Sequence, residues 1–269
     1  MANPALNEKR FETIRKEDVD SDGWGAPETL AGGAGDAVPT TPARTSEMTA
    51  NGTFAKTFAL FLLVLAGGVF GWSQTTVSPS GQTEIPGWAF LCLFVGFGLA
   101  MVCVFKPKAS PFIAPLYALV EGAFLGAISK AFEVQWDGIV FQAVLATVGV
   151  FFATLVLYVL GVVKVTRKFQ MVVIGATCGI FLLYLFGALL SLFGVDVVFW
   201  NEPSVFGIIF SVVICCVASL NLFLDYEFIR QSSVNGAPKY MEWFGAFGIM
   251  VTLVWLYLEM LRLISLLRQ

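Results

Sequence analysis

Long hydrophobic runs separated by short polar connections fill the chain from Phe54 to its end. About 20 consecutive apolar residues span the hydrocarbon core of a membrane as a helix, and seven runs of that kind can be counted. The predicted spans are Phe54–Ser73, Gly87–Phe105, Phe112–Ala131, Gly138–Val162, Phe169–Leu192, Val205–Ile229 and Tyr240–Leu267. Dividing the longest runs differently gives six or eight spans. Seven fits the pattern best, and it predicts an all-α integral membrane fold in which residues 54–269 form a seven-helix transmembrane bundle.

Residues 1–53 have the opposite character. They are polar and rich in Gly, Pro, Ala and Thr, as in "APETLAGGAGDAVPTTPARTSEMTANG", and their nine acidic and five basic side chains give a net charge of −4. Such a segment buries too little apolar surface to offset the conformational entropy that folding would cost. We therefore expect a disordered, acidic tail on the cytoplasmic side.

The composition supports a lipid environment. Hydrophobic residues make up 57% of the chain and charged residues 13%, whereas about a quarter of a soluble domain is charged. This much apolar surface cannot be hidden inside a soluble domain of 269 residues, so most of it should face the lipid bilayer. Residues 54–269 carry a net charge of only +1, which gives no reason to expect nucleic acid as a partner.

Several kinds of chemistry are missing from the sequence. There is no histidine, which excludes His-based triads and His metal ligation. The five cysteines lie in apolar runs without CxxC spacing, and neither a disulfide framework nor a zinc site is indicated. No GxSxG or HExxH motif and no protease-like pair of aspartates is present. We expect a protein that is not an enzyme and holds no cofactor.

Lysine and arginine gather in alternate connections, which sets the expected orientation. The connections on the side of the N-terminal tail carry Arg44, Lys56, Lys106, Lys108, Lys164, Arg167, Lys168, Arg230 and Lys239. The opposite connections have only Lys130, at a helix edge. Arg262 and Arg268 go against this pattern, although a cation suits the C-terminal end of a helix. The pattern predicts a cytoplasmic N-terminus and an external C-terminus.

Acidic residues inside the predicted spans are the candidates for function, because a carboxylate at membrane depth costs on the order of 3 kcal/mol and usually faces a cavity or a partner. Glu121 lies roughly 15 Å from the cytoplasmic edge, near the midplane and too deep for its short side chain to reach water, and is expected to face the bundle interior. Asp225 lies about 6 Å from the cytoplasmic edge, where reaching the interface is an equal alternative. Glu242 and Glu227 are shallow and are expected to face water.

Two further patterns favour structural roles. Glu259 and Arg262 are three residues apart near the outer boundary, as in an ion pair on the surface of a helix. Gly122 and Gly126 form a GxxxG pattern, which allows another helix to approach closely. Because this spacing recurs in Gly-rich membrane helices, helix packing is the favoured interpretation.

Three stretches, "LYALVEGAFLGAIS", "NLFLDYEFI" and "AFGIMVTLVWLYLEMLRLI", resemble the Bax inhibitor-1/YccA family in its bacterial branch. The resemblance covers roughly residues 54–269. It implies a seven-helix bundle with the last helix at its centre. It also implies that the protein is either a pH-sensitive calcium leak or a partner that restrains a membrane-embedded ATP-dependent protease.

In the leaks of that family, an aspartate in the sixth helix pairs with an aspartate in the seventh, and protonation of the pair shifts the balance between open and closed states. The first position matches Asp225. The second falls at Thr252, so the two-carboxylate sensor is incomplete, and Glu242 or Glu121 is a candidate replacement.

The candidate residues for an ion pathway or pH sensing are therefore Asp225, Glu121, Glu242 and Thr252. The acids are spread over several helices, whereas a tight calcium site gathers about 6 to 8 oxygens at one point, so only transient passage of Ca²⁺ is expected. We predict a cation leak in the bacterial plasma membrane. The alternative is a non-conducting protein that modulates a membrane-bound protease or another membrane complex.

Overall fold

The computed structural model describes residues 47–78, 83–193 and 204–269. The seven long helices in this part of the chain are α2 (Ala50–Gln74), α3 (Gly87–Phe105), α4 (Ser110–Gln135), α5 (Ile139–Val159), α6 (Arg167–Leu192), α7 (Val205–Val234) and α8 (Met241–Leu267). All seven are long and apolar enough to cross a membrane, which confirms the seven predicted spans. The expectation of a disordered tail concerns residues 1–46 for the most part, and these lie outside the described residues.

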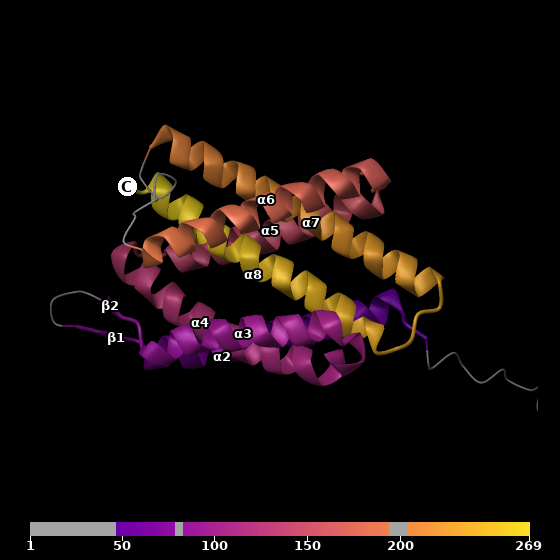
Figure 1. Ribbon diagram of the computed structural model, residues 1–269, viewed down its shortest axis with the longest axis horizontal. Coiled ribbons are helices and arrows are strands. Elements are labelled where there is room, and N and C mark those ends of the chain that lie inside the picture. Colours follow the sequence, from indigo (N-terminus) through magenta and orange to yellow (C-terminus); the bar gives the residue numbers. More distant parts are fainter. Residues whose placement is uncertain (1–46, 79–82, 194–203) are drawn as a thin grey trace, which may run out of the picture. The chain divides into compact units, whose positions relative to one another are not determined.

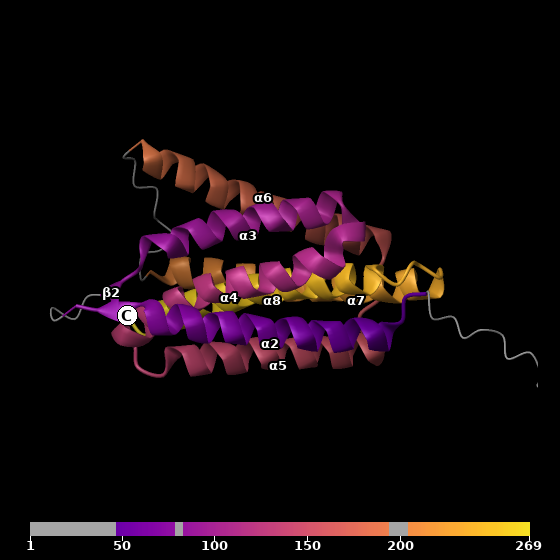
Figure 2. The same ribbon diagram turned by 90° about the horizontal axis from the view of Figure 1, so that it is seen from below.

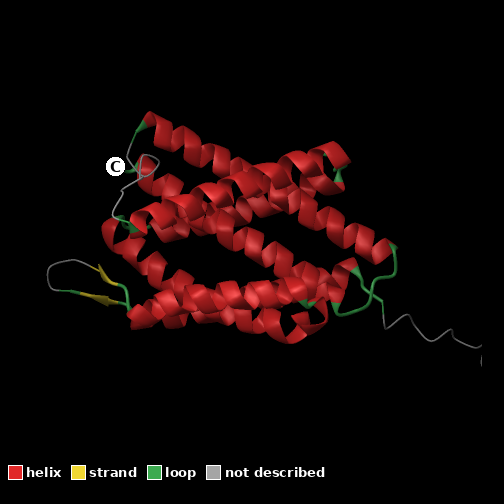
Figure 3. Ribbon diagram, in the orientation of Figure 1, coloured by secondary structure: helices red, strands yellow, loops and turns green. Residues whose placement is uncertain are grey.

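Three short elements complete the described structure. Strands β1 (Thr76–Val77) and β2 (Thr83–Glu84) pair antiparallel between α2 and α3, and the 3₁₀ turn η1 (Pro107–Ala109) precedes α4. Figure 3 shows that helix dominates the described chain. We call the end of the bundle with β1 and β2 the hairpin end. The other end, where α7 is joined to α8, is called the turn end.

The helix boundaries depend on local caps as well as on hydropathy. Helix α2 begins at Ala50, four residues before the predicted span, because the Thr49 side chain accepts a hydrogen bond from the Gly52 N–H. Residues 50–53, which the polar pattern places in the tail, thus belong to a helix. Helix α7 continues five residues past the predicted end, to Val234, through a polar stretch that hydropathy does not mark.

Helix α8 packs against four others, namely α2, α4, α5 and α7 (Figures 1 and 2). Helices α4 and α8 are the most buried, whereas α3 and α6 keep most of their surface exposed. Large apolar side chains cover these exposed faces, such as Phe94 on α3, which is 72% exposed, and Val172 on α6, which is 70% exposed. Such faces suit lipid, because water would make their exposure costly.

Helices α2 and α4 approach each other so closely that their backbones touch. Gly67 of α2 packs against the backbone of α4, and Gly122 and Gly126 of α4 pack against the backbone of α2. A Cβ atom added at Gly122 would lie 2.9 Å from the Val64 Cα atom, which no real side chain tolerates. The GxxxG pattern at Gly122 and Gly126 therefore serves helix packing, as the favoured interpretation held.

The chain just before α2 is fastened to the turn end. The Met48 N–H donates to the Ala237 carbonyl at 2.7 Å, and the Ser233 hydroxyl donates to the Met48 carbonyl at 3.2 Å. The Met48 side chain is buried among residues of α7 and α8, including Ile229 and Ile249. Residues 47–49 thus form a short clasp on the connection between α7 and α8.

Candidate functional site

A carboxylate on α7 is held against a hydroxyl group on α8. The Thr252 Oγ1 donates a hydrogen bond to the Asp225 Oδ2 at 2.7 Å. Its other potential acceptor, the Gly248 carbonyl one turn earlier, lies at 3.2 Å, so the single hydroxyl proton favours the carboxylate. The two positions that the sequence resemblance matched to an aspartate pair are thus in direct contact.

Gly248 makes room for the Asp225 carboxylate. A Cβ atom at Gly248 would lie 3.3 Å from the Asp225 Oδ1, closer than most real Cβ contacts, so a larger residue there would push against the carboxylate. Asp225 itself is partly buried, between the buried side chains of Leu222 and Ile229 on the same helix. The carboxylate therefore lies at the contact between α7 and α8.

The next residue along α7 extends the polar contacts to α5. The Tyr226 hydroxyl lies 3.2 Å from the Thr154 hydroxyl and 3.1 Å from the Phe151 carbonyl. Glu227 was expected to face water, and this was wrong. Its carboxylate is largely buried, accepting hydrogen bonds from Tyr158 on α5 at 2.7 Å and from Arg230 at 2.6 Å and 3.0 Å.

Glu121 lies between α3 and α4. The residue is 7% exposed, and no hydrogen bond or ion pair to another described residue involves it. Its Oε2 lies 2.5 Å from the position that a Cβ atom would take at Gly96 of α3, so the glycine leaves the space in which the carboxyl group sits. The expected burial of Glu121 is thus found, at the interface of two helices.

Glu121 and Asp225 are not partners in the structure. An aromatic contact connects the surroundings of Glu121 with those of Asp225. Tyr117, one turn before Glu121, packs edge-on against Phe247, with 5.1 Å between ring centroids. Phe247 directly precedes Gly248 on α8. The candidate replacement of the second aspartate by Glu121 is therefore not realised, since Thr252 occupies that place.

Glu242 does not replace the second aspartate either, and it does not face water as expected. Its residue is only 2% exposed, and it is paired with Lys56 of α2. It also accepts hydrogen bonds from the Thr49 N–H at 2.9 Å and the Thr49 hydroxyl at 3.0 Å. Gly52, on the first turn of α2, leaves space for this carboxylate. Glu242 thus joins the clasp to the start of α8.

Glu259 and Arg262 form the expected pair, but away from the surface. The Arg262 Nη1 lies 3.6 Å from the Glu259 Oε2, and the two side chains are 15% and 6% exposed. Tyr184 of α6 covers them, donating to the Glu259 Oε1 at 2.6 Å and accepting from the Arg262 Nη1 at 2.5 Å. The Arg262 guanidinium also lies 6.0 Å from the centre of the Phe210 ring on α7. The surface position was wrong because α6 and α7 close over this part of α8.

Sequence reasoning missed the partners of these acids. Lys56 had a signal, since it is a lone cation in an apolar run, but nothing along the chain links it to Glu242. Tyr184 and Thr49 gave no signal, because their roles depend on helices that meet only in the folded chain. Within the residues that the structure describes, no three histidine, cysteine or acidic side chains are grouped so that they could hold a metal ion.

One of three comparisons with known proteins found a match. No curated protein and no solved structure matches the chain. The model of one protein family, described as Bax inhibitor 1 like, matches residues 3–269. Seven membrane-spanning helices and a match over nearly the whole length show that the chain is a polytopic membrane protein belonging to the Bax inhibitor 1 like family.

Proposed function

We propose that the protein is a pH-sensitive cation leak of the bacterial plasma membrane, with the contact between Asp225 and Thr252 as its gate. The observation that carries this proposal is the 2.7 Å hydrogen bond between these two side chains. It links α7 to α8, and both helices are long and apolar enough to cross the membrane. A carboxylate in such a place is costly, and residues of this kind usually mark a pathway for ions or protons. The proposal assigns no catalytic role and no resident cofactor.

Protonation of Asp225 is the proposed switch. A hydrogen bond to an ionised carboxylate is roughly twice as strong as one between neutral groups. When Asp225 takes up a proton, its bond to Thr252 weakens, and the contact between α7 and α8 loosens. We therefore propose that the leak grows as the pH falls.

We propose that the ion is Ca²⁺ and that it passes without being bound tightly. Asp225 is bonded to Thr252, Glu259 to Tyr184, and Glu121 lies against Gly96, so these acids have different neighbours. A tight calcium site needs about 6 to 8 oxygens at one point, which acids separated in this way do not offer. We assign Glu121 to the ion route because it is buried and free of hydrogen bonds to other described residues, and so remains able to meet a cation.

The test is calcium entry into liposomes that contain the purified protein and a trapped calcium dye, measured at acidic, neutral and alkaline pH. Thr252→Val keeps the shape of the side chain but removes its donor, and should raise the flux at neutral pH. Asp225→Asn removes the charge and should flatten the pH dependence.

The matched control is Ser219→Ala on α7, because the Ser219 hydroxyl donates only to the Cys215 carbonyl of its own helix. This variant should behave as the wild type. Flux equal to that of empty vesicles for the wild type, or an unchanged pH profile for Asp225→Asn, would refute the gate.

The clasp supports a second function, in which the protein modulates a membrane-bound protease complex. Residues 47–49 bind the connection between α7 and α8, and the acidic residues 1–46 precede them in the chain. A membrane-bound protease complex that bound this tail would be linked through residues 47–49 to α7 and α8, and no ion would need to pass. Deleting residues 1–46 should then change the turnover of membrane proteins, whereas a leak should survive the deletion.

We also propose that the turn end is cytoplasmic. Lys106, Lys164 and Arg230 lie there, and positive charge favours the cytoplasmic side. A membrane-impermeant thiol reagent added to intact cells should label Glu84→Cys at the hairpin end and leave Lys106→Cys unlabelled. The reverse pattern would overturn this orientation.

A further inference from the structure

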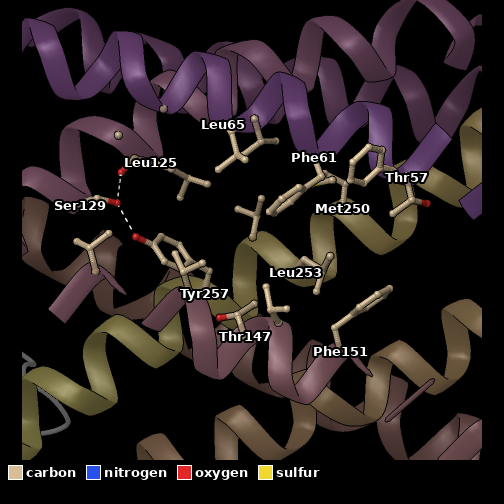
Figure 4. Close-up of a pocket in the computed structure, with 18 of the residues that line it drawn as sticks. Thr57, Phe61, Leu65, Leu125, Ser129, Thr147, Phe151, Met250, Leu253 and Tyr257 are labelled. Carbon is tan, nitrogen blue, oxygen red and sulfur yellow. Dashed lines mark hydrogen bonds between the residues drawn. The ribbon is translucent and has the colours of Figure 1, made fainter. Parts of the chain in front are cut away.

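A large apolar groove lies between α2 and α5, with α4 and α8 as its floor. Its volume is about 1010 Å³. Figure 4 shows Leu65 of α2, Leu253 of α8 and Phe151 of α5 around it. The groove is separate from the Asp225 and Thr252 contact, neither of which lines it.

The hydroxyl groups that line the groove have their hydrogen bonds inside the protein. The Thr57 and Thr147 hydroxyls donate to carbonyls one turn earlier in their own helices, at 3.0 Å and 2.8 Å. The Ser129 hydroxyl lies 2.6 Å from the Leu125 carbonyl and 2.7 Å from the Tyr257 hydroxyl (Figure 4). The occupant therefore meets an apolar wall, which suits hydrocarbon.

The length of the groove matches the hydrocarbon core of a bilayer. Its lining on α2 runs from Phe54 to Ser73, about 28 Å along the axis and close to the full hydrocarbon thickness of a bilayer. An extended acyl chain from either leaflet covers about half of the 30 Å thickness, so the groove is long enough to hold one.

A fixed cation stands at the hairpin end of the groove. The Lys130 ammonium donates to the Trp72 carbonyl at 3.2 Å and to the Thr75 carbonyl at 2.7 Å, which holds it at the end of α2. Trp72 itself lines the groove. An ammonium has three N–H donors, so one is left for a ligand. Lys130 is only partly buried, and a headgroup can reach it.

The nearest acid on the same helix does not neutralise this cation by pairing with it. Glu133 accepts from the Gly138 N–H at 2.7 Å and the Val140 N–H at 3.0 Å, and so caps the start of α5. Arg268 adds a second cation at this end, donating to the Asp137 carbonyl and the Gln142 side chain. Lys130 and Arg268 thus place two cations at the mouth of the groove, together with the interfacial Trp72 and beside the acids Glu133 and Asp137.

We propose that this groove is a binding site for an anionic phospholipid, with an acyl chain between α2 and α5 and the phosphate on Lys130. The apolar wall accepts the chain, and the ammonium at its end discriminates between headgroups by charge. The site stands apart from the proposed leak, and its test uses no flux measurement.

The experiment measures lipids retained by the protein after purification from nanodiscs made of equal parts phosphatidylglycerol and phosphatidylcholine. The wild type should retain phosphatidylglycerol in about tenfold excess, as expected for one charge-assisted contact. Lys130→Gln should retain lipid without this preference. Lys108→Gln, an exposed cation at the turn end, is the control and should keep the preference.

Filling the groove tests the acyl chain. Val144 lines the groove on α5, and Val144→Trp should abolish lipid retention. The neighbouring Leu145 is 55% exposed and does not line the groove, so Leu145→Trp is the matched control. Equal retention by these two variants would overturn the proposal, as would equal retention of both lipids by the wild type.

A measurement on the wild type covers the case in which Val144→Trp fails to fold. Phosphatidylglycerol with a photoreactive group on its acyl chain should form adducts mainly on α2, α5 and α8. Adducts spread equally over the exposed faces of α3 and α6 would mean general solvation by lipid and would overturn the site. Crosslinking of one copy to another through Val144 would assign the groove to a protein partner and would also overturn it.

Discussion

Glu242 offers the sharpest test of how the bundle is held together. Glu242→Gln keeps the size of the side chain and an oxygen that can still accept from Thr49, but it removes the charge that pairs with Lys56. Breaking a buried ion pair on one side costs about 3 to 5 kcal/mol, because the remaining charge is left without a partner. The Lys56 side chain is 18% exposed and lies near the start of α2, where it can partly reach water. We therefore take the lower limit of about 3 kcal/mol.

The assay is thermal unfolding in detergent micelles, followed by tryptophan fluorescence. A loss of about 3 kcal/mol corresponds to a midpoint lowered by about 6 to 12 °C for a domain of this size. The double variant Lys56→Met with Glu242→Gln removes the unpaired charge and should recover at least half of that loss. Glu84→Gln on β2, an exposed acid, is the control and should leave the midpoint unchanged.

The reasoning would be refuted if Glu242→Gln unfolded at the wild-type temperature. It would also fail if the double variant were no more stable than Glu242→Gln alone. The first result would mean that the pair of Glu242 and Lys56 does not stabilise the fold. The second would mean that the loss of stability does not come from the unpaired charge of Lys56.

Three other variants test the site and the packing by the same unfolding measurement. Glu121→Met removes a buried carboxyl group that no other described residue bonds and should stabilise the protein by about 1 to 3 kcal/mol; a lower midpoint would contradict this. Gly122→Ala places a Cβ atom against the Val64 backbone and should destabilise by about 3 kcal/mol, and a neutral effect would mean that α2 and α4 separate freely. Tyr184→Phe removes the hydroxyl between Glu259 and Arg262 and should cost about 1 to 3 kcal/mol, whereas no change would show that the pair stands without it.

Hydropathy predicted the helices well because the bilayer imposes their length. The span Gly87–Phe105 agrees with α3 at both ends. Other helix ends differ from the predicted ones, because the helix continues beyond the apolar run. Helix α7 runs on past Ile229 to Val234, and α4 past Ala131 to Gln135, since polar residues at the membrane surface are still helical.

The candidate site was predicted less completely, for a physical reason. Depth along one helix follows from counting residues, and it identified Glu121 and Asp225 as unusual. The partner of a carboxylate depends on which helices meet and in what rotation. Glu242 and Lys56 are 186 residues apart, so no local pattern could join them. Thr252 was found opposite Asp225 only through the family resemblance.

The backbone contact between α2 and α4 has a consequence for motion. Where Gly67 and Gly122 let two main chains meet, no intervening side chains can rearrange, so sliding or rotation would break the contact outright. We expect this pair to behave as a stationary frame. We therefore expect the motion of the proposed gate to occur in α7 and α8, so that spin labels on these helices change their separation from α4 while the spacing of α2 and α4 stays constant.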